Sequence, residues 1–446
     1  MIVSISGMDG LGKSTQADIL SKRMPQFFTK PLHINQSPSF PKLEKNELAK
    51  WWFNPENKEE FVDTIFACVS ERFEEAKKLS ESGINVVLDK GYDFYLTRVK
   101  ATLLSYGTST QETERLILNA IEKYQLNTKQ ENLKLIIIPP KDYKGIKRAE
   151  EQFTETEIIY DKYNKLNVEI LNKKINDANT FVPVEYIYGE PEKMTQSILK
   201  LINSYNPHPI LYQNIVDSVV EHAKETFQDN LKMVILAGSS VKGHFLENWS
   251  DLDFYVVLKD IKKQELNKFT QKTDQLDLHV GTTFYTLGDL STPLRVDKRT
   301  MVTFYEINIG KNKVLYNPDN LKIPYIDFKQ ISETEESNVA EILNEIKRLV
   351  YFDDFNAKKF IKKITVLEKI VLRSKGFLTE SYQDTMQLFS QVYKTPYIDV
   401  PSLIKQDLNS PEMVELLQNY GDAVLRSLET EKKEKNLKNM GESLER

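Results

Sequence analysis

The feature that most constrains the fold of this chain is a phosphate-loop motif close to its first residue. Residues Gly7 to Ser14 read GMDGLGKS and fit the pattern G-x-x-x-x-G-K-[ST]. The apolar run Ile2–Ser6 precedes the motif, and a helical pattern over Lys13–Met24 follows it. A strand, a glycine-rich loop and a helix in this order predict the start of an α/β fold.

The same alternation continues over the first two hundred residues. Short apolar runs predict further strands at Asn85–Leu88, Lys134–Ile138 and Phe181–Tyr188. Helical periodicity covers Phe61–Ser82, Gln111–Tyr124 and Glu155–Leu171. Strands that alternate with helices imply right-handed crossovers, so we expect a doubly wound parallel sheet with helices on both faces.

The pattern changes after the breaker cluster Asn206–Pro209. A helix is expected at Ile210–Phe227 and another at Lys262–Thr270, with strands at Leu231–Ala237, Asp253–Leu258, Leu276–Val280 and Lys313–Tyr316. From about Ile331 the pattern is helical, over Val339–Tyr351, Ala357–Ser374, Tyr382–Val392 and Pro411–Leu428. We therefore predict an α/β multidomain chain with a phosphate-loop domain (1–205), a small mixed-sheet α/β core (206–327) and a C-terminal helical bundle with a charged tail (328–446).

Composition excludes several classes of protein. The chain has 446 residues, and its 60 Lys and Arg against 65 Asp and Glu give a net charge of −5. This balance disfavours an extended nucleic-acid-binding surface or binding to an anionic membrane. The single cysteine, Cys68, excludes a disulfide framework and a multi-cysteine metal site. The motif leaves no room for a signal peptide and the apolar runs are too short to cross a bilayer, so we expect a cytoplasmic protein. A homodimer is left open.

The residue types in the phosphate loop suit a nucleoside triphosphate and Mg²⁺. Gly7, Gly10 and Gly12 let backbone N–H groups turn towards phosphate oxygens. Lys13 can place its charge on the β- and γ-phosphates, and the Ser14 hydroxyl can bind the metal. Thr15 follows at the helix N-terminus, which favours an anion. We expect ATP or another NTP to bind here.

These residues resemble the thymidylate kinase family of nucleoside monophosphate kinases, over about residues 1–201. The resemblance implies that Asp9 lies near the substrate sugar, that Arg72 contacts the monophosphate and that Asp89 lies near Mg²⁺. It also places Lys147 and Arg148 in a lid that supplies cations to the transferred phosphoryl group.

Two departures from the family pattern leave the phosphoryl acceptor open. Cys68 stands where the family places a base-stacking phenylalanine. Lys90 replaces the arginine that follows the aspartate, and it keeps the charge without the bidentate fork.

A second chemical motif lies in the middle of the chain. Asp251 and Asp253 are two residues apart at a predicted strand, so their carboxylates share a face. Such a pair needs a divalent cation, and oxygen ligands suit Mg²⁺ or Mn²⁺. Asp277, in the predicted strand Leu276–Val280, is a third candidate ligand. Upstream, Gly238 and Ser239 can offer a backbone N–H and a hydroxyl to phosphates.

This constellation resembles the DNA polymerase beta-like nucleotidyltransferase superfamily, in particular its small bacterial and aminoglycoside-modifying branches, over about residues 210–323. Gly238-Ser239, Lys242-Gly243, Ser250-Asp251-Leu252-Asp253 and Asp277 occur in the family's order. The resemblance implies that Asp251 and Asp253 bind metal, that Lys242 contacts the nucleotide and that Asp277 helps to deprotonate the acceptor hydroxyl. The helices that follow resemble those that shape acceptor binding in such enzymes.

The sequence thus predicts a bifunctional, magnesium-dependent transferase. Its first part would transfer a phosphoryl group to a nucleoside monophosphate or related acceptor, and its second part a nucleotidyl group to an acceptor hydroxyl. The alternative is a nucleotidyltransferase that modifies an antibiotic, an RNA or a protein, in defence or toxin control, with the kinase-like part as a nucleotide-sensing module.

Overall fold

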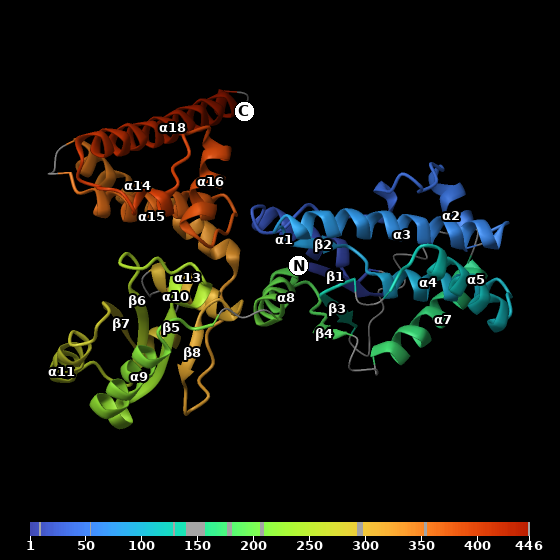
Figure 1. The fold of residues 1–446 in the computed structure, drawn as a ribbon, viewed down its shortest axis with the longest axis horizontal. Coiled ribbons are helices and arrows are strands. Elements are labelled where there is room, and N and C mark those ends of the chain that lie inside the picture. The colour runs from blue at the N-terminus through green and yellow to red at the C-terminus, as the bar shows by residue number, and fades with distance from the viewer. Residues whose placement is uncertain are drawn as a thin grey trace. The chain divides into compact units, whose positions relative to one another are not determined.

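The computed structural model describes all residues except 9, 54, 128–129, 140–156, 176–180, 206–208, 292–297, 352–354 and 445–446. The chain divides into two compact units, Met1–Ile198 and Leu199–Arg446 (Figure 1). The second unit contains both the second sheet and the C-terminal helices. The division into three domains at 205/206 and 327/328 stays a prediction.

The first unit is built on a four-stranded parallel sheet, as predicted. Its strands lie in the order β2-β1-β3-β4. They are β1 (Ile2–Gly7), β2 (Val86–Leu88), β3 (Leu133–Ile138) and β4 (Val182–Glu185). Val3 of β1 pairs with Val87 on one side and Leu133 on the other. The central strands are buried, which is why they read as continuous apolar runs.

Seven described helices belong to or begin in the first unit. They are α1 (Lys13–Arg23), α2 (Lys45–Phe53), α3 (Lys58–Glu81), α4 (Tyr92–Ser105), α5 (Thr110–Lys123), α7 (Glu157–Ile175) and α8 (Pro191–Tyr205). Helix α4 was not predicted. Most of its residues are buried, so its sequence lacks the single apolar stripe that signals a surface helix.

The second unit contains a mixed sheet, again as predicted. Its order is β7-β6-β5-β8, and only β6 and β7 run parallel to each other. The strands are β5 (Leu231–Ala237), β6 (Leu252–Leu258), β7 (Val280–Thr286) and β8 (Lys313–Tyr316). Apolar side chains of β5 and β6 form a core with α9 (Gln213–Phe227) and α11 (Lys263–Thr273).

The predicted strand Leu276–Val280 is wrong. Residues 276–278 form a bend after α11, where the Leu276 N–H donates to the Thr273 carbonyl at 3.1 Å, and β7 begins only at Val280. Leu276 and Leu278 pack against the core from this bend. Two leucines separated by one residue therefore imitated the alternation of a strand.

Further helices lie around this sheet and after it. Around the sheet are α10 (Ser239–Lys242), α12 (Leu287–Ser291) and α13 (Lys298–Asn308). The C-terminal group consists of α14 (Phe328–Tyr351), α15 (Ala357–Ser374), α16 (Tyr382–Tyr393), α17 (Val400–Leu403) and α18 (Pro411–Leu444). Figure 1 shows this group, in orange and red, on the side of the second unit where α10 and α13 lie. Among the described helices, none has a stretch apolar and long enough for a membrane span.

The connection between β5 and β6 is anchored in the C-terminal helices. Trp249 is only 5% exposed and belongs to the core cluster of α14, α15, α16 and α18, and Leu246 packs against the same cluster. The Ser250 N–H donates to the Leu246 carbonyl at 2.8 Å, and the Leu246 N–H donates to Ser250 Oγ at 3.0 Å. Because Asp251 follows directly, the helical core fixes the start of the acidic motif.

A buried ion network fixes the end of β2 in the first unit. Lys134 Nζ lies 2.7 Å from Asp93 Oδ2 and 3.7 Å from Glu131 Oε2, and the Tyr92 N–H donates to Glu131 Oε1 at 2.7 Å. Burial raises the pKa of Glu131 to about 7, although the Lys134 charge opposes this rise. The network joins β3 to the first turn of α4, and so holds the Asp89–Tyr92 segment between β2 and α4.

We predict a pH-dependent stability that Glu131→Gln removes. An unfolded glutamate has a pKa of about 4.3. Between about pH 4.3 and about pH 7 the folded chain keeps a proton that the unfolded chain has released, so the contribution of Glu131 is full below this window and is lost as the pH rises through it. The free energy of unfolding of the native protein should fall relative to that of the variant by up to about 1.4 kcal/mol per pH unit. Urea unfolding at about pH 5 and about pH 7 checks this; parallel profiles would show that Glu131 is ionised in the fold.

Candidate functional site

The glycine-rich loop of the first unit has the backbone that the motif requires. Gly7, Gly10 and Gly12 have φ values of 141°, 82° and 75°, which disfavour residues with a Cβ. A Cβ on Gly7 would also lie 2.9 Å from the Ile137 carbonyl oxygen of β3. Helix α1 starts at Lys13 directly after Gly12, so its N-terminal N–H groups border the loop.

Three cations of this unit surround one aromatic ring. Lys13 is 5% exposed, and its Nζ donates to the Met8 carbonyl at 2.6 Å and lies 5.3 Å from the centre of the Phe94 ring. Lys90 Nζ and the Arg98 guanidinium each lie 5.8 Å from the same ring centre. Arg98 also stacks at 4.6 Å on Trp52. Arg98 was not among the predicted residues, because the helix that carries it was not predicted.

Asp89 lies next to these cations and is 2% exposed. Its Oδ2 contacts Lys90 Nζ at 2.6 Å and His33 Nδ1 at 3.1 Å. Burial pushes the pKa of Asp89 upwards, but Lys90, the Ser14 hydroxyl and His33 outweigh it and lower the pKa below the usual value. Among the described residues, none forms a hydrogen bond with the buried Oδ1. His33 is a contact that sequence reasoning did not find.

The other predicted residues of this unit are less closely grouped. Arg72 pairs with Glu75 of its own helix at 2.7 Å. Cys68 is buried, which raises the pKa of its thiol to about 11. Thr15 is exposed in the first turn of α1. Asp9, Lys147 and Arg148 lie outside the described residues.

In the second unit the acidic motif lies at the start of β6. Asp251 directly precedes the strand, and Asp253 pairs in the sheet with Ala237 of β5. The Asp253 carboxylate lies between two glycines. A Cβ on Gly281 would approach its Oδ1 to 3.1 Å, and a Cβ on Gly238 would overlap its Oδ2. A larger residue at Gly238 would displace the carboxylate, and one at Gly281 would crowd it.

The charges around the acidic motif shift the pKa of Asp253 in opposite directions. Partial burial and the neighbouring Asp251 charge raise the pKa of Asp253 to about 6, while Lys242, Lys362 and His279 lower it. Lys362 Nζ of α15 lies 3.1 Å from Asp251 Oδ2, and His279 Nδ1 lies 3.5 Å from Asp251 Oδ1. The two carboxylates therefore have cationic or basic groups on both sides.

Helix α15 presents a basic face to this region. Lys358 lies 5.4 Å from the Trp249 ring centre and Lys369 lies 5.5 Å from that of Tyr382. Along α15, Lys358, Lys362, Lys369 and Arg373 follow one another at intervals of four, seven and four positions. This spacing places them on one side of the helix. A hollow of about 440 Å³ lies along α15, lined by Asn356, Lys358, Lys359, Lys362, Lys363 and Val366.

Lys242 and Glu306 extend the charged region. Lys242 Nζ lies 2.6 Å from Glu306 Oε1. Burial raises the pKa of Glu306, but Lys242, Lys311 and Arg373 outweigh it, so the net shift is downwards. Burial and the charges of Lys242 and Arg373 lower the pKa of Lys369 to about 8. The sequence predicted Lys242 alone of this group, because the others come from separate helices that meet only in the fold.

Asp277 does not join the other two carboxylates in a metal-binding cluster. It is exposed in the bend before β7. Over the described parts of the chain, no group of three or more His, Cys, Asp or Glu side chains is arranged to hold a metal ion. His279, not Asp277, lies beside Asp251. Leu252 of β6 pairs with Val280 of β7, so the residues that precede them, Asp251 and His279, are also neighbours.

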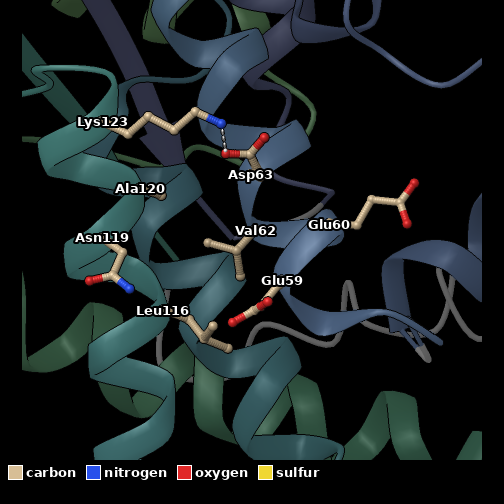
Figure 2. Close-up of a pocket in the computed structure, with 8 residues that line it drawn as sticks. All are labelled: Glu59, Glu60, Val62, Asp63, Leu116, Asn119, Ala120 and Lys123. Carbon is tan, nitrogen blue, oxygen red and sulfur yellow. Dashed lines mark hydrogen bonds and ion pairs between the residues drawn. The ribbon is translucent and has the colours of Figure 1, made fainter.

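One further hollow in the first unit involves none of the predicted residues. Figure 2 shows it between α3 and α5, with Val62, Leu116 and Ala120 as its apolar part. Its volume is about 370 Å³. Glu59, Glu60 and Asp63 give it an acidic rim, and Lys123 pairs with Asp63 at 2.6 Å. The described residues that line this hollow include none from the phosphate loop.

We predict that Gly238→Ala destabilises the protein more than Gly376→Ala. Both glycines have positive φ values, 78° and 88°, but nothing lies within 4 Å of a Cβ on Gly376. The control therefore carries only the backbone penalty, about 1–2 kcal/mol. In Gly238→Ala, displacement of the Asp253 carboxylate and a backbone conformation (φ 78°, ψ −157°) that is nearly restricted to glycine should together add about 1–3 kcal/mol. Denaturant unfolding of both variants measures the difference, and equal losses would contradict the tight contact.

Comparison with known proteins agrees with the second motif. Residues 216–382 match the family model described as a nucleotidyltransferase domain. A relative from Methanocaldococcus jannaschii, named as a protein adenylyltransferase, is 27% identical over 123 residues, which are 26% of this chain and 80% of the relative.

Two solved structures show more distant likeness. A spectinomycin adenyltransferase from Enterococcus faecialis is 15% identical, with a TM-score of 0.35 over 48% of this chain and 99% of that one. A thymidylate kinase from Candida albicans is 16% identical, with a TM-score of 0.31 over 46% of this chain and 91% of that one. The family match confirms that residues 216–382 carry a nucleotidyltransferase domain, and with it that the chain is a transferase enzyme.

Proposed function

We propose that the second unit transfers a nucleotidyl group from ATP or another NTP to an acceptor hydroxyl. The observation that carries this proposal is the position of Asp253. Its carboxylate is held between Gly238 and Gly281, next to Asp251 and within the charge field of Lys242 and Lys362. This arrangement supports the proposal, because two carboxylates suited to a metal, a glycine-containing loop suited to phosphates and nearby lysines would then act together.

The donor set fits a divalent cation. The Lys362 ammonium already occupies a cation position on Asp251, at 3.1 Å. Mg²⁺ is usually held by one or two carboxylates together with substrate phosphates, so Asp251 and Asp253 suffice without a third protein ligand. When bound, Mg²⁺ or Mn²⁺ would neutralise phosphate charge and make the acceptor hydroxyl more acidic.

The neighbouring groups are suited to bind a triphosphate. Gly238 has a positive φ and Ser239 opens the short helix α10, so the Ser239 hydroxyl and nearby N–H groups can bind phosphate oxygens. Lys242 supplies positive charge near the acidic motif, which would stabilise the pyrophosphate as it leaves. Because Glu306 pairs with Lys242, it would fix the direction of that ammonium.

The acceptor is proposed to be a hydroxyl of a protein. The support is the relative named as a protein adenylyltransferase, of which the match covers most of the length. A small molecule or an RNA as acceptor is the alternative that labelling from radioactive ATP would reveal, since the label would then leave the protein fraction.

For the first unit we propose phosphoryl transfer from ATP. Lys13, Lys90 and Arg98 converge at Phe94, where they can neutralise phosphate charge. Asp89 is buried and the Ser14 hydroxyl lies close enough to lower its pKa, so this pair fits a Mg²⁺ ion or its waters. Asp9, Arg72, Lys147 and Arg148 keep the roles that the family resemblance implies. The alternative, a nucleotide-sensing module, would bind ATP at the same loop without turnover.

We predict that the two activities are lost separately. Lys13→Ala should abolish ADP formation and leave NTP-dependent pyrophosphate release intact, with the exposed Lys22→Ala as its control. Asp251→Asn with Asp253→Asn should lower pyrophosphate release by several orders of magnitude, because neutral amides bind a divalent ion weakly; the exposed Asp260→Asn is the matched control. Full pyrophosphate release in the double variant would contradict the assignment of the nucleotidyltransferase site to these two carboxylates. Absence of ADP formation in the native protein would favour the sensing module.

We also predict that His279 contributes more to the acceptor step than Asp277. The family resemblance assigns proton removal to Asp277, but His279 is the group that contacts Asp251. His279→Gln should lower kcat at least tenfold, in the range of general-base catalysis, while Asp277→Asn changes it about twofold or less. Steady-state kinetics on both variants, with nucleotide binding measured separately, tests this order. The reverse order would restore Asp277 as the base.

A further inference from the structure

The ion pair between Lys362 and Asp251 lies where a divalent ion would bind. Lys362 Nζ is 3.1 Å from Asp251 Oδ2, and each side chain is 35% exposed, so small ions in solution can reach the pair. Asp253 lies two residues further along the same edge. An ammonium and a divalent cation cannot both occupy the same carboxylate oxygen without strong repulsion.

The fold, rather than chance contact between long side chains, places Lys362 there. One helical turn earlier on α15, Lys358 stacks on Trp249 at 5.4 Å. Trp249 is buried in the core of the C-terminal helices, two residues before Asp251. The backbone of α15 is therefore fixed next to the acidic motif, and only the flexible part of Lys362 is free to leave Asp251.

We infer that Lys362 is an exchangeable counter-cation, which neutralises Asp251 in the metal-free protein and must be displaced when a divalent ion binds. This inference deepens the proposed nucleotidyltransferase site and rests on its metal ligands. An exposed lysine–carboxylate pair stabilises by at most about 1 kcal/mol, so it can be displaced by an ion that binds two carboxylates. The hollow along α15 offers space for the released ammonium.

The released ammonium also has a second role. Once Lys362 has left Asp251, its charge lies beside the point where the triphosphate is proposed to bind. Lys362 therefore weakens the binding of a metal ion alone and strengthens the binding of a metal–nucleotide complex. A lysine with only a structural role, or with only a phosphate-binding role, would not produce these two effects of opposite sign.

Mn²⁺ binding to the full chain without nucleotide tests the inference. Lys362→Met should bind Mn²⁺ about fivefold more tightly than the native protein, which corresponds to loss of a competing pair of ~1 kcal/mol. Lys362→Arg keeps the charge and should bind as the native protein does. Lys363→Met removes a neighbouring charge that pairs with Glu345 instead of Asp251, so it should leave Mn²⁺ affinity unchanged. Electron paramagnetic resonance of free Mn²⁺ gives these affinities directly.

The same variants are then titrated with a non-hydrolysable ATP analogue in the presence of Mn²⁺. Lys362→Met should now bind several-fold more weakly than the native protein. Unchanged or weaker binding of Mn²⁺ alone in Lys362→Met, or equal gains in Lys362→Met and Lys363→Met, would overturn the counter-cation role. Mn²⁺ binding that persists in the Asp251→Asn, Asp253→Asn variant would instead overturn the metal site itself, so the two failures are distinguishable.

Discussion

Asp251 and Asp253 carry like charges two residues apart at the start of β6, and Lys242, Lys362 and His279 offset the effect of Asp251 on Asp253. Asp251 directly precedes β6 and Asp253 lies two residues further on, where its carboxylate packs against Gly238 and Gly281. Desolvation of its carboxylate and the Asp251 charge raise the pKa of Asp253 to about 6, although the residue is exposed.

These cations come from elements that are distant in the sequence. Lys242 lies on the short helix after β5, whereas Lys362 lies on α15, more than a hundred residues later. Trp249 explains how the two parts are held together. Trp249 lies in the connection before the acidic motif, and its side chain is buried in the core of the C-terminal helices. Packing of apolar side chains thus fixes the geometry of a polar site. The C-terminal helices therefore help to position the acidic motif.

In the first unit the clustered like charges are positive instead of negative. Lys13, Lys90 and Arg98 are cations gathered around Phe94, and the aromatic ring and the buried Asp89 reduce their mutual repulsion. Such a group of partly desolvated cations favours an anionic ligand at the loop. The Glu131–Lys134–Asp93 network fixes the segment that carries Asp89 and Lys90, so one buried group of charges supports the placement of another.

The sequence by itself determined the order of elements and the local motifs, because these depend on residues close together in the chain. Glycines with positive φ in the phosphate loop, the apolar strands of both sheets and the two-residue spacing of Asp251 and Asp253 are all local properties. The alternation at Leu276 and Leu278 led to the wrong prediction of a strand. The two side chains reach the core from a bend, which periodicity alone cannot distinguish from a strand.

Only the tertiary structure decided which charges meet. His279 rather than Asp277 lies beside Asp251 because the register of β7 against β6 is set by long-range pairing. Lys362 meets Asp251, and Arg98 meets Phe94, through helices whose faces are chosen by packing. Their sequences showed lysines at helical spacing and an aromatic-rich segment, but not their partners. Contacts between distant residues depend on the free energy of the whole core, and a local pattern carries no information about that choice.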